Sequence, residues 1–335
     1  MKQWIKRLLL LAVILVIGYS ARLYTAEQST AAAQDNTKAQ HTVSRAADNY
    51  FYRQLDETEQ ALYDGLNSNR KQMKSGVYTI PFEDQFSDVL ELPRGFTQLN
   101  NSFQAAVDAY LQDNPNVFYL NIRHLYLHID TTTFLGMDTY NVYIDNGQKA
   151  SYLAKPFTSR ETVVRAQRRM KAVREQIVRQ STGDDYTDIC MVHDYLVDNV
   201  EYDSSHPGTC YSAYGALVKH KAVCQGYAKA FQYLMDALDI PCILVSGTAS
   251  DADGNLESHA WNYVQLSGKW YAVDVTWDDP VFEDALSETL LSASARTTYL
   301  LKGEQTMSED HFPDGVLTTG SKHFSYPELN ESDYK

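Results

Sequence analysis

The segment from His259 to Thr276, HAWNYVQLSGKWYAVDVT, constrains the fold of this chain most. Two stretches of alternating, strand-like character, 260–266 and 269–276, flank Ser267-Gly268, a two-residue signal for a β-hairpin. A turn at this position brings His259 and Asp274 close together across the hairpin. An aspartate within an apolar strand needs a polar partner, and we predict that His259 is that partner.

A second segment, KAVCQGYAKAFQYLMDAL (221–238), predicts an amphipathic helix that begins at or just after Cys224. The amino end of a helix carries partial positive charge and unpaired N–H groups, which stabilise a thiolate, the reactive form of cysteine. The backbone N–H groups near Cys224 and Gln225 can also bind an oxyanion. We therefore predict that Cys224 is a nucleophile and that Gln225 lies in its oxyanion or substrate-binding site.

Cysteine, histidine and aspartate in these contexts predict a catalytic triad. Cys224 would attack, His259 would act as general base, and Asp274 would fix the tautomer and orientation of His259. The alternative is a purely structural role, in which His259 is a core histidine hydrogen-bonded to a structural aspartate. His220 is a competing base, but it lacks an adjacent acid and is interpreted as a surface residue.

Other polar residues near these motifs are given no catalytic role. Asp278 and Asp279 precede a proline, and we expect them to be capping or surface groups. The spacing of cysteines and histidines fits no zinc pattern, so we predict no metal and no other cofactor.

Three separated stretches resemble the core of the bacterial transglutaminase-like superfamily of cysteine enzymes: AVCQGYAKAFQYLMDALDIPCILVSGTA, HAWNYVQLSGKWYAVDVTWDDP and YLLKGEQTMSEDHFPDG. The resemblance covers about residues 185–326. It implies a papain-like α+β fold, with the cysteine on a helix packed against an antiparallel sheet that carries histidine and aspartate. Matched residue by residue, it assigns these three roles to Cys224, His259 and Asp274.

The predicted function is acyl transfer at a peptide or glutamine-type amide of a protein or cell-wall peptide. Water as acceptor gives a protease or deamidase, and an amine gives a cross-linking transglutaminase. The sequence does not decide between them. Two alternatives stay open: a non-catalytic binding module of the cell envelope with the same fold, and a structural envelope protein whose amino-terminal half does the work.

The chain is predicted to have four parts. Residues 1–26 place Lys2, Lys6 and Arg7 before the apolar run Leu8–Ile17, which is typical of a signal peptide or an amino-terminal membrane anchor. Either one places the body outside the cytoplasm, with membrane contact only through this segment. Residues 27–46 are predicted to be a flexible tether, 47–155 a smaller α+β domain, and 156–330 the catalytic domain.

Secondary structure outside the two key motifs follows ordinary signals. We predict a helix from about residue 96 that ends at Asn114-Pro115 and is followed by a strand, then antiparallel strands in RHLYLHID (123–130) and TYNVYIDNG (139–147). A capping box from Thr158 to Glu161 opens a helix to about Gln180, and another helix covers 186–199.

Composition limits the class of protein and its partners. With 44% hydrophobic residues over 335 positions the chain is globular, and a net charge of -14 excludes nucleic acid as a partner. Four cysteines allow three complete disulfide pairings, but a chain of this length needs no such framework. Cys190 and Cys242 are interpreted as core residues, Cys224 is predicted to be free, and Cys210 and the oligomeric state receive no assignment.

Overall fold

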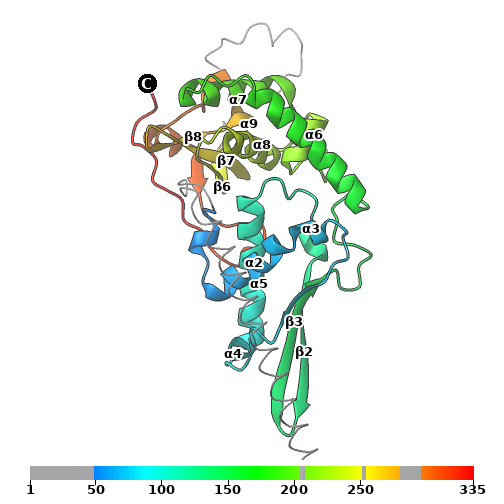
Figure 1. Ribbon diagram of the computed structural model, residues 1–335. Coiled ribbons are helices and arrows are strands. Elements are labelled where there is room, and N and C mark those ends of the chain that lie inside the picture. Colours follow the sequence, from blue (N-terminus) through cyan, green and yellow to red (C-terminus); the bar gives the residue numbers. More distant parts are fainter. Residues whose placement is uncertain (1–48, 204, 206–207, 251–253, 280–295) are drawn as a thin grey trace, which may run out of the picture. The chain divides into compact units, whose positions relative to one another are not determined.

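The computed structural model describes residues 49–203, 205, 208–250, 254–279 and 296–335 (Figure 1). The predicted leader and tether, 1–46, lie outside the described residues. Contacts gather residues 46–335 into one compact unit, and the predicted division of this unit at residue 155 stays a prediction. Within the described ranges, no helix has the length and apolar character needed to cross a membrane.

The first part of the unit combines a helical pair with a small sheet. Helices α2 and α5 pack against each other, and the sheet has the antiparallel order β1-β3-β2. Asp56 caps α2 in a capping box with Glu59. The elements are η1 (Tyr52–Gln54), α2 (Glu57–Ser68), α3 (Arg70–Met73), β1 (Ile80–Glu83), α4 (Ser87–Leu90), α5 (Gly95–Asp113), η2 (Ile122–His124), β2 (Tyr126–Phe134) and β3 (Met137–Asp145).

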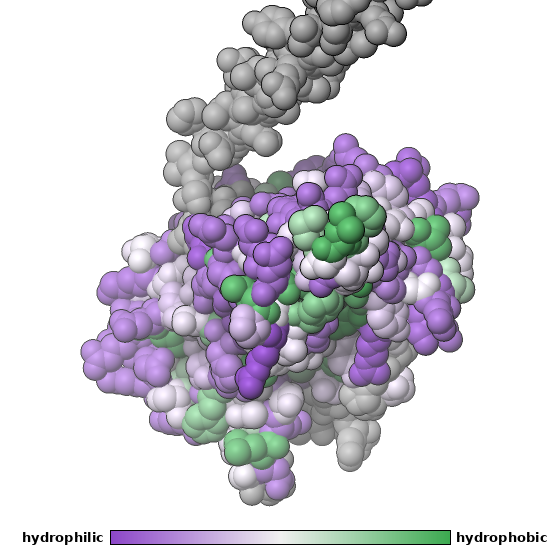
Figure 2. All heavy atoms as spheres, turned by 90° about the horizontal axis from the view of Figure 1, so that it is seen from below, coloured by the Kyte–Doolittle hydropathy of each residue, from purple (hydrophilic) through white to green (hydrophobic). Residues whose placement is uncertain are grey.

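Strands β2 and β3 form the hairpin expected from the sequence. Leu135 and Gly136 close it with φ angles of 52° and 78°. The tip carries three exposed apolar side chains, Phe134, Leu135 and Met137, and Figure 2, which looks onto this end from below, shows a group of apolar residues there. The strand expected after Pro115 is wrong, because the chain there makes only a single bridge, Leu120 to Leu153.

The second part places helices beside a four-stranded antiparallel sheet of order β8-β7-β6-β9. Helix α8 packs on β6 and β7, and α6 and α7 pack on α8 (Figure 1). This mixture of helices and antiparallel sheet confirms the predicted α+β class. The elements are α6 (Arg160–Val178), α7 (Asp185–Asn199), β4 (Glu201–Tyr202), η3 (Gly215–Lys219), β5 (Lys221–Ala222), α8 (Cys224–Ala237), β6 (Cys242–Ser250), β7 (Leu256–Leu266), β8 (Lys269–Val273), α9 (Val275–Asp278), α11 (Glu304–Met307) and β9 (His311–Pro313).

The predicted hairpin is the one formed by β7 and β8. Ser267 and Gly268 have φ angles of 54° and 77°, both positive as a type I′ turn requires. Pairing runs from Leu266 with Lys269 to Asn262 with Val273. Strand β8 ends at Val273 instead of continuing to residue 276, because Asp274 caps the short helix α9 with its side chain.

Two helix starts refine the predictions. The capping box of α6 pairs Ser159 with Thr162, one residue after the pair expected from the sequence, and α6 ends at Val178. Helix α7 covers Asp185–Asn199, close to the predicted range, and Asp184 caps it. Both helices therefore begin where a short polar side chain accepts a backbone N–H bond.

Residues 314–326, which we call the C-terminal strap, connect the two parts. Asp108 of α5 accepts hydrogen bonds from the backbone N–H (3.0 Å) and Oγ1 (2.6 Å) of Thr319. Lys322 Nζ donates to Glu59 Oε2 of α2 at 2.5 Å. One hydrophobic core cluster includes residues of both α5 and α8, so the parts share their interior.

Candidate active site

Cys224 is the first residue of α8, as predicted, and its thiol is free and partly exposed. Gly226, two residues later, lies against the backbone of Cys210: a Cβ at this position would come within 2.1 Å of the Cys210 carbonyl oxygen. Glycine is required here for close packing of the first helical turn. The first N–H groups of a helix lack an earlier turn to bond to. Those of Gly226 and Tyr227 bond to the Val223 carbonyl oxygen, so the N–H groups of Cys224 and Gln225 are the candidates for a ligand beside the sulfur.

His259 lies in β7 with 5% of its surface exposed. Its Nε2 donates to Asp274 Oδ2 at 2.6 Å. The other oxygen of Asp274, Oδ1, accepts from the backbone N–H groups of Thr276 (2.9 Å) and Trp277 (3.3 Å) at the start of α9. One oxygen of Asp274 thus holds the imidazole, and the backbone N–H groups bound to its second oxygen hold the carboxylate in place.

The electrostatics of this pair favour an imidazolium and a carboxylate. Burial by itself lowers the pKa of His259, but Asp274 and the Cys224 side chain outweigh it and raise the pKa to about 10. Burial raises the pKa of Asp274, but His259 and His311 outweigh it and hold this pKa well below its usual range. The structure therefore brings Cys224, His259 and Asp274 together, as the sequence predicted, while their catalytic roles stay predictions.

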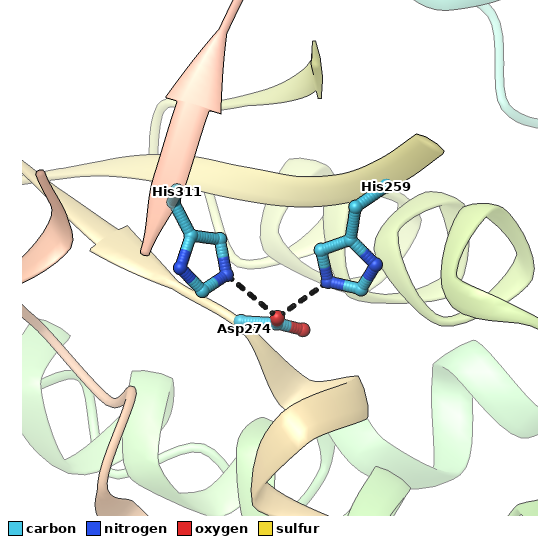
Figure 3. A group of neighbouring side chains, drawn as sticks. All are labelled: His259, Asp274 and His311. Carbon is cyan, nitrogen blue, oxygen red and sulfur yellow. Dashed lines mark hydrogen bonds and ion pairs between the residues drawn. The ribbon is translucent and has the colours of Figure 1, made fainter. Parts of the chain in front are cut away.

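A second histidine, which sequence reasoning did not single out, contacts the same carboxylate. His311, at the start of β9, has its Nε2 3.1 Å from Asp274 Oδ2, so two imidazoles converge on one oxygen (Figure 3). The His311 Nδ1 lies 2.5 Å from Asp310 Oδ1, and Tyr299 Oη donates to Asp310 Oδ2 at 2.6 Å. A hydrogen-bonded chain thus extends from the buried His259 to the partly exposed Tyr299.

The same cluster has the spacing of a possible metal site. Ligand atoms of His259, Asp274 and His311 all lie within 4.8 Å of one another. Each imidazole, however, already makes a hydrogen bond to the shared Asp274 oxygen, and an ion would have to displace both bonds. The hydrogen-bonded arrangement accounts for the geometry of these residues, and the absence of a metal stays a prediction.

Cys224 and His259 line an open cavity of about 380 Å³. Its walls come from the first turn of α8, the facing segments of β6 and β7, and the C-terminal strap. Gln225, the predicted oxyanion or substrate-binding residue, lies in this wall next to Cys224, half-buried. One wall residue, Gln112, comes from α5, more than 100 positions before Cys224 in the sequence.

The expectation is wrong for Asp278, whereas Asp279 is the C-cap residue of α9 and is only partly buried. Asp278 is fully buried and contacts His193 Nε2 at 3.1 Å, while its Oδ1 accepts from the backbone N–H of Tyr299 at 2.9 Å. Asp279 accepts a hydrogen bond from the buried Tyr227 hydroxyl. The contact between His193 and Asp278 spans 85 positions, so the local sequence around each residue gave no signal for it.

The exposed His220 agrees with its interpretation as a surface residue. It has a left-handed φ of 57°, and its Nδ1 lies 2.9 Å from the carbonyl oxygen of Asn199. The structure shows it at a bend before β5, with its ring engaged by the backbone rather than by an acid.

All four cysteines lie in the described residues and are free thiols. Cys242 is buried in β6, as expected, whereas Cys190 is only half-buried. The Sγ of Cys210 donates to Asp203 Oδ2 at 3.1 Å. Burial, and then Asp203, raise the pKa of Cys210 to about 12, and burial also raises the pKa of Cys190 and Cys242. The three other thiols are therefore poorly disposed to react at neutral pH.

Comparison with known proteins gives the following matches. The family model described as "Transglutaminase-like superfamily" matches residues 171–275, a range that includes Cys224, His259 and Asp274. Kyphoscoliosis peptidase of Mus musculus is 27% identical over 132 residues, which are 36% of this chain and 20% of that protein. The human protein gives the same identity and coverage. The chain thus spans about one fifth of the length of these curated relatives.

Solved structures give weaker similarity. A structure described as a TGase has a TM-score of 0.31 and 16% identity, covering 52% of this chain and 51% of the other. The periplasmic domain of TgpA from Pseudomonas aeruginosa has a TM-score of 0.27 and 15% identity, covering 46% of this chain and 63% of the other.

Proposed function

This chain belongs to the transglutaminase-like superfamily, and we propose that it is a cysteine-dependent acyl-transfer enzyme acting on amide bonds of peptides or proteins. The observation that carries the proposal is the contact between a helix-start thiol, Cys224, and a buried imidazole, His259, that a capped carboxylate holds in place. A binding module has no need for these three groups in this order. Such a triad is recognised by its geometry and by the role of each member.

In the first half of the reaction, the thiolate of Cys224 attacks the carbonyl carbon of the substrate amide and forms an S–C bond. The backbone N–H groups of Cys224 and Gln225 stabilise the oxyanion that results. His259 donates its proton to the leaving nitrogen, the C–N bond breaks, and a thioester remains on Cys224. The raised pKa of His259 keeps this proton in place at neutral pH.

In the second half, His259 is neutral and accepts a proton from water or from an amine as that group attacks the thioester. Water yields a carboxylic acid, and an amine yields a new amide, so the same site supports hydrolysis and cross-linking. Asp274 remains a carboxylate in both halves and stabilises the imidazolium each time it forms.

We also propose that the protein acts outside the cytoplasm. The basic residues and apolar run within 2–17 support export, which would present the cleft to proteins or cell-wall peptides outside the cytoplasm. The alternative function is that of a non-catalytic module of the cell envelope that binds such peptides.

The alkylation rate of Cys224 against pH tests the proposal. We expect His259→Ala to slow iodoacetamide labelling of Cys224 at pH 6 to 7, because the imidazolium that stabilises the thiolate is gone. His220→Ala removes an exposed histidine and should label like the wild type. Identical curves for His259→Ala and the wild type would overturn the triad and favour the binding module.

Turnover is measured separately. Wall fragments, casein and a labelled amine are incubated with the protein, and products are identified by mass spectrometry. We expect His259→Ala to lower the rate by about 10²- to 10⁴-fold, the usual effect of removing a general base. Release of the leaving amine reports formation of the thioester in either reaction, a new carboxylic acid indicates hydrolysis, and incorporation of the labelled amine indicates cross-linking.

A further inference from the structure

Gln112 connects the first part of the chain to the cavity around Cys224. It lies in the last turn of α5 and belongs to the cavity lining. Its side chain is almost fully enclosed, with 4% of the residue exposed. A residue of the predicted 47–155 segment thus lines the same cavity as Cys224 and His259.

The position of Gln112 is fixed from two sides. Its backbone carbonyl accepts a buried hydrogen bond of 3.0 Å from Gln232 Nε2, and Gln232 lies in α8, the helix that Cys224 begins. One turn earlier in α5, Asp108 binds Thr319 of the C-terminal strap, which also contributes residues to the cavity lining. The end of α5 is therefore held against the elements that shape the cavity.

The carboxamide of Gln112 has no partner of its own. Its Oε1 is buried and lacks a hydrogen bond. The buried amide of Asn262 in β7, by comparison, has partners: its Nδ2 donates to the carbonyl oxygens of Ala228 (3.0 Å) and Ile243 (3.2 Å). Leaving a buried polar group unpaired is costly, so each such group needs an explanation.

The cavity supplies the explanation for Gln112. Other buried polar atoms among the described residues also lack a hydrogen bond, among them Tyr110 Oη and Gln232 Oε1, but neither of these two residues lines the cavity that holds Cys224. Among the described residues with such unpaired atoms, only Gln112 also lines the cavity of Cys224. Because this oxygen is itself enclosed, a ligand would complete its hydrogen bonding only after the carboxamide turns toward the cavity.

We propose that Gln112 is a positioning residue that hydrogen-bonds an amide group of the acyl-donor substrate. A carboxamide offers one acceptor oxygen and an NH₂ donor, and this set complements the N–H and C=O of a peptide unit. The inference rests on the proposed acyl transfer and narrows it: the substrate presents a peptide amide next to the bond that Cys224 attacks. The first part of the chain then takes part in substrate recognition.

Two thiol reagents test this role without requiring turnover. Chloroacetyl-glycinamide carries amide groups, and Cys224 sulfur displaces its chloride to form a thioether. Methyl methanethiosulfonate carries no amide, and the same sulfur takes its CH₃S group as methanesulfinate leaves. We measure the second-order rate constants of both reagents at Cys224 by peptide mass spectrometry at pH 7. The rate constant for chloroacetyl-glycinamide divided by that for methyl methanethiosulfonate reports recognition of the amide.

We expect Gln112→Met to lower this ratio by about 3- to 10-fold, the effect of one neutral hydrogen bond. Gln104→Met is the matched control, because Gln104 lies in the same helix but outside the cavity of Cys224. This control should keep the wild-type ratio. Gln112→Asn, which retracts the carboxamide by one methylene, should lower the ratio too and serves if the methionine variant does not fold.

An unchanged ratio in a folded Gln112 variant would overturn the inference. So would an equal fall with both reagents, because Gln112 would then act on the thiol and not on the amide. The outcome is separable from the proposed function. If Gln112→Met lowers the ratio but the wild type turns over no amide, acyl transfer is refuted and Gln112 remains a peptide contact. If the wild type turns over amides but Gln112→Met leaves the ratio unchanged, only the role of Gln112 is refuted.

Discussion

Asp274→Asn should change how the stability of the protein depends on pH. Asparagine caps helices as well as aspartate does, so α9 keeps its cap, but the charge that holds the proton on His259 is lost. A His259 pKa raised from 6.5 to about 10 corresponds to about 5 kcal/mol of stabilisation of the charged form. His259 has only 5% of its surface exposed, so solvent does little to screen this interaction.

The direction follows from proton linkage. Between pH 6.5 and 10 folded His259 keeps a proton that the unfolded chain has released, so the folded state binds more protons and stability falls as pH rises. The contribution is fully present below pH 6.5, declines by at most about 1.4 kcal/mol per pH unit, and is lost as pH passes 10. In Asp274→Asn burial leaves His259 neutral, and this slope disappears.

Urea unfolding followed by tryptophan fluorescence from pH 6 to 10 measures the effect. The free energies of unfolding of the wild type and Asp274→Asn should differ most at pH 6 and converge toward pH 10. His220→Gln, at an exposed histidine, should run parallel to the wild type. Parallel curves for the wild type and Asp274→Asn across the whole range would show that Asp274 does not hold the proton on His259.

Further expectations concern single side chains and topology. Cys224→Ala should unfold at the wild-type temperature by calorimetry yet show no turnover, and residual turnover would exclude Cys224 as nucleophile. Asp278→Ala leaves His193 buried without this partner and should cost about 3–5 kcal/mol in urea unfolding, while a loss below about 1 kcal/mol would contradict their pairing. Gly247→Ala places a Cβ 2.1 Å from a backbone oxygen of β9 and should lower the unfolding temperature, which an unchanged temperature would refute. A phosphatase fused after Lys335 should be active outside the cytoplasm, and cytoplasmic fluorescence of an equivalent fluorescent fusion would refute export.

Local signals were sufficient for the central residues of the site. The helix that starts at Cys224 follows from apolar spacing, and the turn at Ser267-Gly268 follows from residues that accept positive φ. Both signals lie within a few positions of the features they predict. The hairpin then carries His259 and Asp274 together, because its register is fixed by a two-residue turn.

Long-range contacts account for what was missed. His311 reaches Asp274 because β9 pairs with β6, an association across more than 60 positions that no local pattern announces. Asp278 looked like a capping or surface group because it stands just before Pro280 in a predicted turn, but α7 supplies a buried histidine from far upstream. The sequence had no signal for Gln112, since its importance comes only from the docking of α5 beside α8.

The C-terminal strap has a consequence for how the chain can be divided. It contributes Asp314 and Thr318 to the cavity of Cys224, and a few residues later it is bonded to α5 and α2. Cutting the chain before residue 314 would therefore open one wall of the cleft and release the first helices in a single step. Separate expression of 156–330 would remove α5, which packs on β6 and contributes Gln112 to the cavity lining, so the two segments are better treated as one folding unit than as modules that can be exchanged.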